Sequence, residues 1–510
     1  MDRSFLRRFP MKSSPSAPLL SATESAAEMH ANLSRLRNAI EQEAEQTFDG
    51  WRPAIEREDF LPSAKNLARY LALRKVDLRG IQDGLVLMGM SSLGRCESHV
   101  GPTLDAASAT LACVAGLTPE PYPIPSSFHD GPQRVSRARD AMFGEGQPGT
   151  RIMVTLPSEA AEDANIIRQF VYAGATSLRI NCAHDDETAW AAMIRHIREI
   201  SREVGRTVRI NMDLGGPKVR TDLGDKLKGK RLFSGDRFSL VRELPEDRKG
   251  LAVATLNHPE LIDRLVIGSR VWLDDGKIGG VVESLDENGA VIEVTSVRPS
   301  GVKIKHEKGV NLPGVAVEIP ALTEKDLNDL DFVARHADTI GFSFVQTSQD
   351  VRDLITALEE RLGDAPLPAV MLKIETELAV RNLPRLLVQA GGRLPVAVMI
   401  ARGDLSVELG MDRTSEMQEE ILWMCAAAHV PTVWATQVLE SLMKEGLASR
   451  AEVTDAAMGQ RAECVMLNKG PYAPQGIAFL QEVLHRMERH HGKRIALMGP
   501  LNSWRELQEL

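Results

Sequence analysis

The segment PAVMLKIETELAVRNLPRLLVQAGGRLPVAVMIAR, residues 368–402, contains the repeating unit that decides the fold. Short apolar runs at 368–375 and 395–402 flank a stretch with a helical pattern at 376–390. Short β-rich runs that alternate with helical ones are typical of parallel strands connected by helices. We therefore interpret the segment as strand, helix and strand, the unit of an α/β fold.

The same unit recurs on both sides of this segment. Eight strand-like runs begin at residues 151, 176, 207, 339, 368, 395, 431 and 463. Eight consecutive units favour a (β/α)8 TIM barrel. The alternative, an open doubly wound sheet, usually carries a Gly-rich phosphate-binding turn after its first strand, whereas the turn here reads TLPSEA at 155–160. We therefore expect the barrel.

Two regions depart from this alternation. Between about 216 and 315 the chain has short strand-like runs rich in Gly, Asp and Lys, which predict a small β-barrel domain inserted as a lid. The N-terminal region has helical patterns, with Ser63 as a plausible N-cap, and its stretch 116–135 is dense in Pro, Gly and Ser like a linker. The expected domains are 1–130 for an N-terminal helical extension, 148–216 and 316–492 for the two parts of the barrel, 217–315 for the lid and 493–510 for a C-terminal tail.

Composition excludes several classes of protein. The chain of 510 residues has 61 Lys and Arg against 70 Asp and Glu, a net charge of -9, which argues against nucleic-acid binding. Its five cysteines are widely spaced, as in a reducing compartment, and no apolar stretch approaches the ~20 residues that a membrane helix needs. We expect a cytoplasmic protein that binds neither nucleic acid nor membrane. The basic, Ser- and Pro-rich start is interpreted as a tail rather than a transit peptide.

Polar residues at the ends of the predicted strands indicate one site. Glu375 and Asp404 end neighbouring strands, and because barrel strands end at one rim, both carboxylates can share a hard cation such as Mg²⁺. Lys373 lies two residues before Glu375, so the two side chains point to the same side, where a lysine can neutralise a phosphoryl group. Each residue alone is more often an ion pair or a loop anchor, but their convergence favours a site. A phosphate clamp can come from Arg179, Arg220 and Lys308.

Long motifs in this chain resemble those of pyruvate kinases. The segment KGVNLPGVAVEIPALTEKDLNDLDF (308–332) resembles the junction where that family returns from its small β domain to its barrel. MLKIE (371–375), MIARGDLSVELG (399–410) and ATQVLESLMK (435–444) resemble three further signatures, and LRINCAH (178–184) and MDLGGPKVRT (212–221) look like the second- and third-strand motifs. The resemblance covers roughly residues 150–490.

The resemblance implies a reaction and a role for each matching position. The implied activity is that of glycolytic pyruvate kinase, in which phosphoenolpyruvate and ADP give pyruvate and ATP under a closing lid. Lys373 would stabilise the phosphoryl group, Arg179 would contact the phosphate, and Thr436 would lie near the enol methylene. Glu375 and Asp404 would bind Mg²⁺ or Mn²⁺. The substrate carboxylate would be seated by the backbone of Ala401, Arg402 and Gly403. The nucleotide would contact Asn181, His184, Arg220 and Lys308. A homo-oligomer is also expected.

The chain departs from the family pattern at four places. Ala183 replaces a serine that helps to hold potassium, Leu214 replaces a threonine nearby, and Lys218 stands where potassium-dependent members have a glutamate. A lysine ammonium can substitute for a monovalent cation, so Lys218 with Asp213 predicts activity without potassium. NKGPY (468–472) replaces a Ser-Gly-Glu-Thr loop, and the TLPSEA turn is one residue tighter. The family's C-terminal domain has no counterpart, so we expect no activation by sugar phosphates.

Two other functions remain open on the sequence alone. A related aldolase or lyase could use the same carboxylate pair to hold an enolate, and NKGPY favours this mildly. A non-catalytic protein is disfavoured because the matching site residues are intact. SSLGRCESHVGPTLDA (91–106) could be a binding motif, but we favour a packing or oligomerisation module for the N-terminal region.

Overall fold

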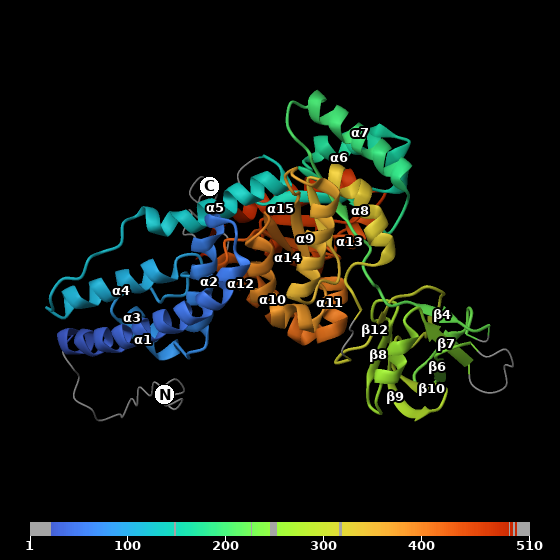
Figure 1. Ribbon diagram of the computed structural model, residues 1–510, viewed down its shortest axis with the longest axis horizontal. Coiled ribbons are helices and arrows are strands. Elements are labelled where there is room, and N and C mark those ends of the chain that lie inside the picture. The colour runs from blue at the N-terminus through green and yellow to red at the C-terminus, as the bar shows by residue number, and fades with distance from the viewer. Residues whose placement is uncertain are drawn as a thin grey trace, which may run out of the picture.

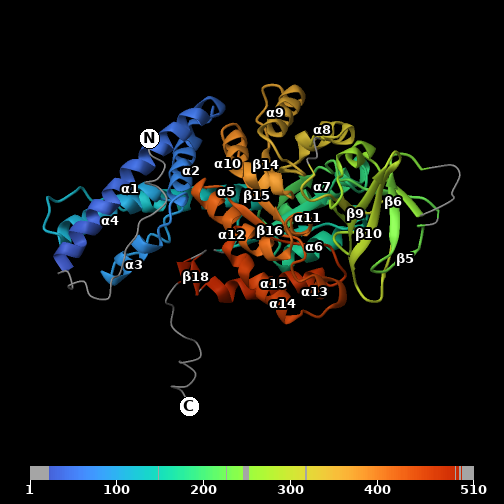
Figure 2. The same cartoon turned by 90° about the horizontal axis from the view of Figure 1, so that it is seen from below.

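The computed structural model describes residues 22–146, 149–225, 227–244, 252–315, 319–488, 490–492 and 495–496. N-terminal helices lie at one end of the molecule, the barrel lies in the middle, and the inserted β domain lies at the other end (Figures 1 and 2). The predicted tail at the start of the chain lies outside the described residues. Within the part that the structure describes, no helix is long and apolar enough to cross a membrane.

A closed barrel of eight parallel strands forms the centre of the molecule and confirms the predicted fold. Each of these strands is almost completely buried, because it is covered by helices outside and by side chains inside. The barrel order is β1-β17-β16-β15-β14-β13-β3-β2. The strands are β1 (Arg151–Thr155), β2 (Ser177–Asn181), β3 (Arg209–Asp213), β13 (Thr339–Phe342), β14 (Ala369–Ile374), β15 (Val396–Ala401), β16 (Thr432–Ala435) and β17 (Cys464–Leu467).

Helices follow the barrel strands, and their starts are specified locally. Thr323 caps α8 in a capping box with Asp326, as its place before the helical pattern predicts. Two short helices, α11 (Arg402–Leu409) and α13 (Glu440–Glu445), were not expected from the sequence. The others are α6 (Ala164–Ala173), α7 (Glu187–Glu203), α8 (Glu324–His336), α9 (Ser348–Leu362), α10 (Glu377–Gly391), α12 (Met411–Ala427), α14 (Arg450–Met458) and α15 (Ala473–Glu488), with short turns η4 (Ser158–Ala161) and η6 (Gly459–Arg461). A strand pair, β18 (His491–Gly492) and β19 (Ile495–Ala496), follows; the rest of the predicted C-terminal tail lies outside the described residues.

The inserted domain is an open seven-stranded sheet, a partial barrel, with its own hydrophobic core around Phe238 and Ile292. Its order is β12-β8-β9-β10-β6-β7-β4, and β11 pairs with β5 beside it. The strands are β4 (Thr221–Leu223), β5 (Arg231–Leu232), β6 (Arg237–Val241), β7 (Ala252–Leu256), β8 (Arg270–Leu273), β9 (Ile278–Asp286), β10 (Gly289–Val297), β11 (Val302–Lys303) and β12 (Val310–Asn311), with the 3₁₀ turn η5 (Pro259–Arg264).

The N-terminal region is helical, as predicted, and α2 packs on α12 of the barrel. Asn66 of α2 is buried and donates from Nδ2 to the carbonyl oxygen of Ala427, at 2.8 Å. The elements are α1 (Ala22–Trp51), η2 (Arg52–Ala54), η3 (Glu58–Phe60), α2 (Leu61–Arg74), α3 (Arg79–Leu87), α4 (Val100–Val114) and α5 (Ser126–Phe143).

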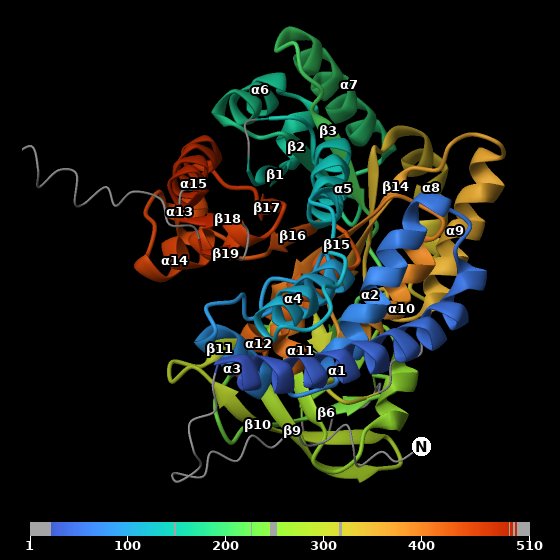
Figure 3. The same cartoon turned by 90° about the vertical axis from the view of Figure 1, so that its left-hand side faces the viewer.

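Two local predictions in this region are wrong. The predicted linker at 116–135 is irregular only up to Pro125, because α5 begins at Ser126; this helix contacts β1 and overlaps the barrel in the view of Figure 3. Packing outweighs its Pro and Gly content: a Cβ at Gly131 would lie 2.4 Å from the carbonyl oxygen of Ser98, and Phe143 is buried among barrel residues. Ser63 is not an N-cap, because α2 begins two residues earlier, at Leu61. The hydroxyl of Ser63 instead hydrogen-bonds with Nδ1 of His429 at 2.9 Å.

Candidate active site

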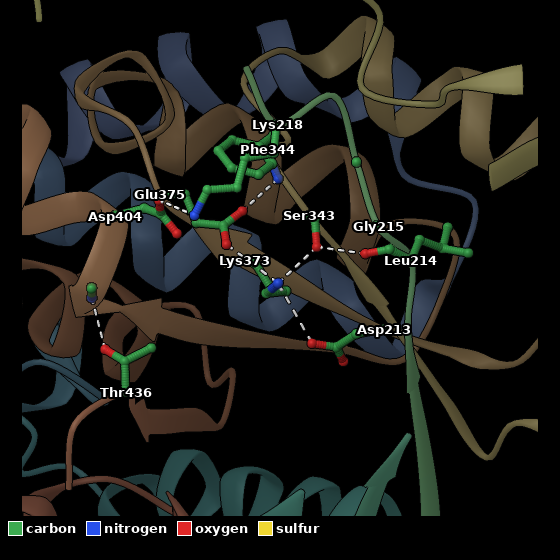
Figure 4. A network of polar contacts seen from close by, with 12 residues as sticks. Asp213, Leu214, Gly215, Lys218, Ser343, Phe344, Lys373, Glu375, Asp404 and Thr436 are labelled. Atoms are coloured by element: carbon green, nitrogen blue, oxygen red, sulfur yellow. Dashed lines mark hydrogen bonds and ion pairs between the residues drawn. The ribbon is translucent and has the colours of Figure 1, made fainter. Parts of the chain in front are cut away.

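Lys373 lies at the centre of a polar network at the C-terminal ends of the barrel strands (Figure 4). Its ammonium donates to the hydroxyl of Ser343 at 2.7 Å and lies 3.2 Å from Glu375 Oε1 and 3.5 Å from Asp213 Oδ2. The Ser343 hydroxyl in turn donates to the carbonyl oxygen of Leu214, so its oxygen accepts from the lysine. Lys373 is therefore fixed on three sides in a nearly water-free position.

Asp213 holds two cations together. Arg179 donates from Nε to Asp213 Oδ2 at 2.8 Å and from a terminal nitrogen to Thr155 Oγ1 at 3.1 Å. Burial raises the pKa of Asp213, but the charges of Arg179 and Lys373 outweigh it and hold this pKa below its usual range. Oδ1 of Asp213 is buried and has no hydrogen-bond partner among the described residues. The aspartate is thus a fixed anion that orients both cations toward the barrel mouth.

Glu375 and Asp404 form the carboxylate pair: Glu375 directly follows β14, and Asp404 lies in the first turn of α11, which directly follows the neighbouring strand β15. Glu375 Oε2 accepts from the backbone N–H of Phe344 at 2.6 Å. Burial raises the pKa of Glu375, and nearby Asp404 raises it further, against the lowering effect of Lys373. Two carboxylates that repel each other in a buried site are a donor set for Mg²⁺ or Mn²⁺, which bind one or two carboxylates together with substrate oxygens and water. Within the described ranges no cluster of three or more His, Cys, Asp or Glu side chains could hold a metal by itself.

Lys218 occupies a different position from the one expected. Its ammonium lies 2.9 Å from Asp404 Oδ1 and 3.3 Å from Asp275 Oδ1 of the lid, not beside Asp213 (Figure 4). Burial lowers the pKa of Lys218, but the two aspartates outweigh it, so the net pKa is raised and the ammonium stays charged. The cations that neutralise Asp213 are Arg179 and Lys373 instead. Lys218 therefore connects a predicted metal ligand to the lid.

The segment after β15 is held by Arg402 and Thr436. The Arg402 guanidinium pairs with Asp455, donates to the carbonyl oxygens of Ala435 and Thr436 and lies 4.4 Å from the centre of the Trp434 ring. Its side chain therefore braces the rim. The N–H of Gly403 donates to Thr436 Oγ1 at 2.7 Å, and Thr436 has a φ of 65°, a conformation that threonine rarely adopts. Such strain at a rim is typical of a positioned functional side chain.

The predicted nucleotide ligands separate into two groups. Asn181 and His184 line a cavity of about 260 Å³ at the rim, together with Arg179 and Thr155. Arg220 and Lys308 lie instead on the lid, where Arg220 donates to the carbonyl oxygen of Glu307 and Lys308 lies 3.6 Å from Asp274. The structure does not bring these two groups of residues together.

Sequence reasoning missed two cations of the same cavity. Lys444 and Lys469 line it together with Arg179, and Lys444 pairs with Glu440 of the same cavity. Lys469 belongs to the NKGPY segment, which departs from the family pattern and mildly favours an aldolase or lyase on the sequence alone. The sequence did offer a signal for Lys469, because this residue directly follows the predicted strand run at 463–468 and so lies at the rim of the barrel.

A second cavity, of about 310 Å³, lies between the lid and the barrel. Lys218, Asp404 and Glu408 line it. Asn311 of the lid donates to Glu408 Oε1 at 3.1 Å, and burial raises the pKa of Glu408 to about 7. The lid is therefore joined to α11 by a carboxyl group that titrates near neutral pH.

These features define a (β/α)8 barrel with a lysine, an arginine and two carboxylates gathered at the C-terminal ends of its strands. Residues 147–474 match the family model for the pyruvate kinase barrel domain, and the chain belongs to the pyruvate kinase family. It is 32% identical over 347 residues to pyruvate kinase of Geobacillus stearothermophilus, covering 67% of this chain and 57% of that protein. It is 33% identical over 350 residues to pyruvate kinase of Methylorubrum extorquens, covering 67% and 69%. The chain thus spans little more than half the length of the Geobacillus relative.

A solved structure shows the same relationship. The crystal structure of a pyruvate kinase from Cryptosporidium parvum superposes with a TM-score of 0.61 at 25% sequence identity, covering 70% of this chain and 71% of that one. The N-terminal helices α1 to α5 lie before the residues that match the family model.

Proposed function

We propose that this protein transfers the phosphoryl group of phosphoenolpyruvate to ADP, giving pyruvate and ATP, and that it needs no potassium. The observation that carries the proposal is the fixed cation pair: Lys373 and Arg179 are both held by the buried carboxylate of Asp213. Phosphoryl transfer depends on positioned positive charge more than on covalent chemistry, and this pair provides it without reorganisation.

The reaction exchanges one phosphorus–oxygen bond for another. A terminal oxygen of ADP attacks phosphorus, the bond to the enol oxygen breaks, and the enolate takes one proton at its methylene carbon to become pyruvate. Lys373 and Arg179 stabilise the negative charge on the migrating group. Glu375 and Asp404 would hold a divalent cation, which supplies further positive charge and a contact for the substrate carboxylate. Because Thr436 Oγ1 accepts from Gly403, its own proton is free to face the substrate.

The lid and the rim cavity support a nucleotide acceptor. Lys469 and His184 line the cavity beside Arg179, and Lys444 lines it while paired with Glu440, which also lines it together with Asp185; cations in such a pocket suit the phosphates of a nucleoside diphosphate. A lid that excludes water prevents hydrolysis of the phosphoryl donor. This supports a kinase over the alternative aldolase or lyase, which has no need for a nucleotide pocket.

Independence from potassium is supported by the side chains around Asp213. Ala183 and Leu214 offer no side-chain oxygen to a monovalent cation. Asp213 is already neutralised by two cationic side chains, and Lys218 adds a fixed ammonium at Asp404. A further monovalent cation would have few ligands and little charge to neutralise. Location in the cytoplasm and self-association stay predictions.

Pyruvate formation tests both parts of the proposal. Purified protein is mixed with phosphoenolpyruvate, ADP and Mg²⁺ in sodium or potassium buffer. We expect equal rates in the two buffers, and a rate at least ~100-fold lower for Lys373→Met, because a transition-state cation is lost. Lys325→Met, at an exposed lysine on α8, is the matched control and should keep the wild-type rate. A strict requirement for potassium would refute the independence, and full activity of Lys373→Met would refute the mechanism.

A further inference from the structure

A cavity of about 490 Å³ lies entirely within the N-terminal region, between the loop after α3, helix α4 and the start of α5. These helices lie at the end of the molecule opposite the lid (Figures 1 and 2). The cavity lies outside residues 147–474, so it is not part of the matched barrel domain. Its volume falls within the range of small-molecule sites, about 300–1,000 Å³.

The wall of the cavity is mostly apolar and aromatic. Leu93, Tyr122 and Phe128 line it, and the Tyr122 side chain is 63% exposed although it is large and hydrophobic. The ring of His99 meets the ring of Phe128 edge to face, with centroids 5.3 Å apart. An apolar wall with a few convergent polar groups is the usual composition of a site for a small organic molecule.

The polar groups of the cavity carry one uncompensated positive charge. Arg95 is exposed and lines the cavity, no Asp or Glu lines it, and among the described residues none forms a hydrogen bond or ion pair with the Arg95 side chain. Burial lowers the pKa of His99, so this imidazole is neutral at neutral pH, and its Nδ1 hydrogen-bonds with Thr103 Oγ1 at 2.8 Å. A guanidinium without a partner at the edge of an apolar cavity favours an anionic ligand.

We propose that this cavity is a binding site for a small planar aromatic or heteroaromatic anion. The ring of the ligand lies against Tyr122 and Phe128, and its carboxylate or phosphate pairs with Arg95. Thr103 and Thr110 provide hydroxyl groups between these two ends. The segment SSLGRCESHVGPTLDA is thereby assigned a binding role in addition to packing, because Arg95, His99 and Thr103 all belong to it.

The loop that forms the site is hydrogen-bonded to the barrel. Asn66 donates from Nδ2 to the carbonyl oxygens of both Glu97 and Ala427, at 2.7 and 2.8 Å. The carbonyl oxygen of Ser98 lies 2.9 Å from Nε2 of His429, which precedes β16. A ligand that orders this loop therefore stabilises the contact between the N-terminal region and the barrel, and its binding should raise the unfolding temperature of the whole chain.

Isothermal titration calorimetry on the full chain tests the site with two matched pairs of probes. Indole-3-acetate and its uncharged analogue indole-3-acetamide test a carboxylate, and AMP and adenosine test a phosphate. In one of the two pairs, we expect the anion to bind at least about tenfold more tightly than its neutral analogue. The pair that shows the difference identifies the anionic group.

Variants separate this site from the barrel rim. Arg95→Gln should weaken binding at least about tenfold, and Tyr122→Ser, at an exposed ring outside the core, should weaken it as well. Arg79→Gln, an exposed arginine of the same region that pairs with Asp77, is the control and should bind like wild type. The proposal is overturned if neither anion binds, or if an anion binds Arg95→Gln and Tyr122→Ser as tightly as wild type, which would place it at the rim cavity.

Discussion

Replacing Asp213 by asparagine should destabilise the barrel strongly while leaving its shape unchanged. Asp213 is fully buried, and its Oδ2 lies 2.8 Å from Arg179 Nε and 3.5 Å from Lys373 Nζ. Lys373 still has Glu375 at 3.2 Å as a charged partner in the variant, so the loss falls mainly on Arg179, which keeps only neutral acceptors, the hydroxyl of Thr155 and the new amide oxygen. Removing one partner of a buried ion pair costs about 3–5 kcal/mol, because the remaining charge is buried without compensation.

Urea unfolding followed by tryptophan fluorescence measures this cost, since Trp190 and Trp434 are buried in the barrel. Glu203→Gln is the matched control: it makes the same change to an Arg–carboxylate pair at the surface and should alter stability immeasurably. Asp213 has a lowered pKa when folded, so its stabilising effect is present above the unfolded pKa of ~3.9 and is lost as the pH falls through the folded value. The reasoning is refuted if Asp213→Asn unfolds like Glu203→Gln, or if its deficit grows toward acid pH.

Three further predictions concern the metal site, the lid and the N-terminal region. Lys218→Met should tighten Mn²⁺ binding to the substrate-free protein several-fold, because the ammonium no longer competes with the metal for Asp404. Electron paramagnetic resonance measures the concentration of free Mn²⁺ and hence the affinity, and weaker binding by the variant would contradict the prediction. Burial raises the pKa of Glu408 to about 7 in the folded protein, so the free energy of unfolding of wild type falls as the pH rises from the pKa of the unfolded chain toward 7. Glu408→Gln lacks this loss and should unfold at a higher temperature than wild type at pH ~8 but not at pH ~4. Asn66→Ala leaves buried backbone groups of Glu97 and Ala427 unsatisfied, so it should cost about 1–3 kcal/mol and speed proteolysis between α2 and α5; an unchanged digestion pattern would count against this docking.

The barrel could be predicted because its strands are buried on both faces and read as apolar runs between helical patterns. The short helix α11 escaped prediction because it begins directly at the end of β15, inside the polar stretch around Asp404. Helix α5 was mistaken for a linker because its Pro and Gly content is typical of loops, whereas contacts with Ser98 and the barrel hold it helical. Those contacts join residues far apart in the sequence, so no local pattern reveals them.

The central residues of the site followed from strand ends alone. Lys373 lies on β14, Glu375 directly follows it, and Asp404 lies within three residues of the end of the adjacent strand β15, so the order of the strands already places them near one another. Lys218 could not be placed in this way, because its position depends on how the chain enters the lid and on Asp275, which lies in a left-handed turn of the lid. Lys444 and Lys469 were missed because they lie on connections after the strands, whose paths the strand pattern does not determine.

The central claim is that Lys373 and Arg179 promote transfer of a phosphoryl group to a nucleotide and not to water. Phosphorus-31 NMR follows this transfer directly in a mixture of the protein, phosphoenolpyruvate, ADP and Mg²⁺. The account predicts that the phosphoenolpyruvate signal is replaced by the γ-phosphate signal of ATP in equal amount, and that Lys373→Met leaves both substrates unchanged. Release of inorganic phosphate in place of ATP, or no reaction with the wild-type protein, would contradict it.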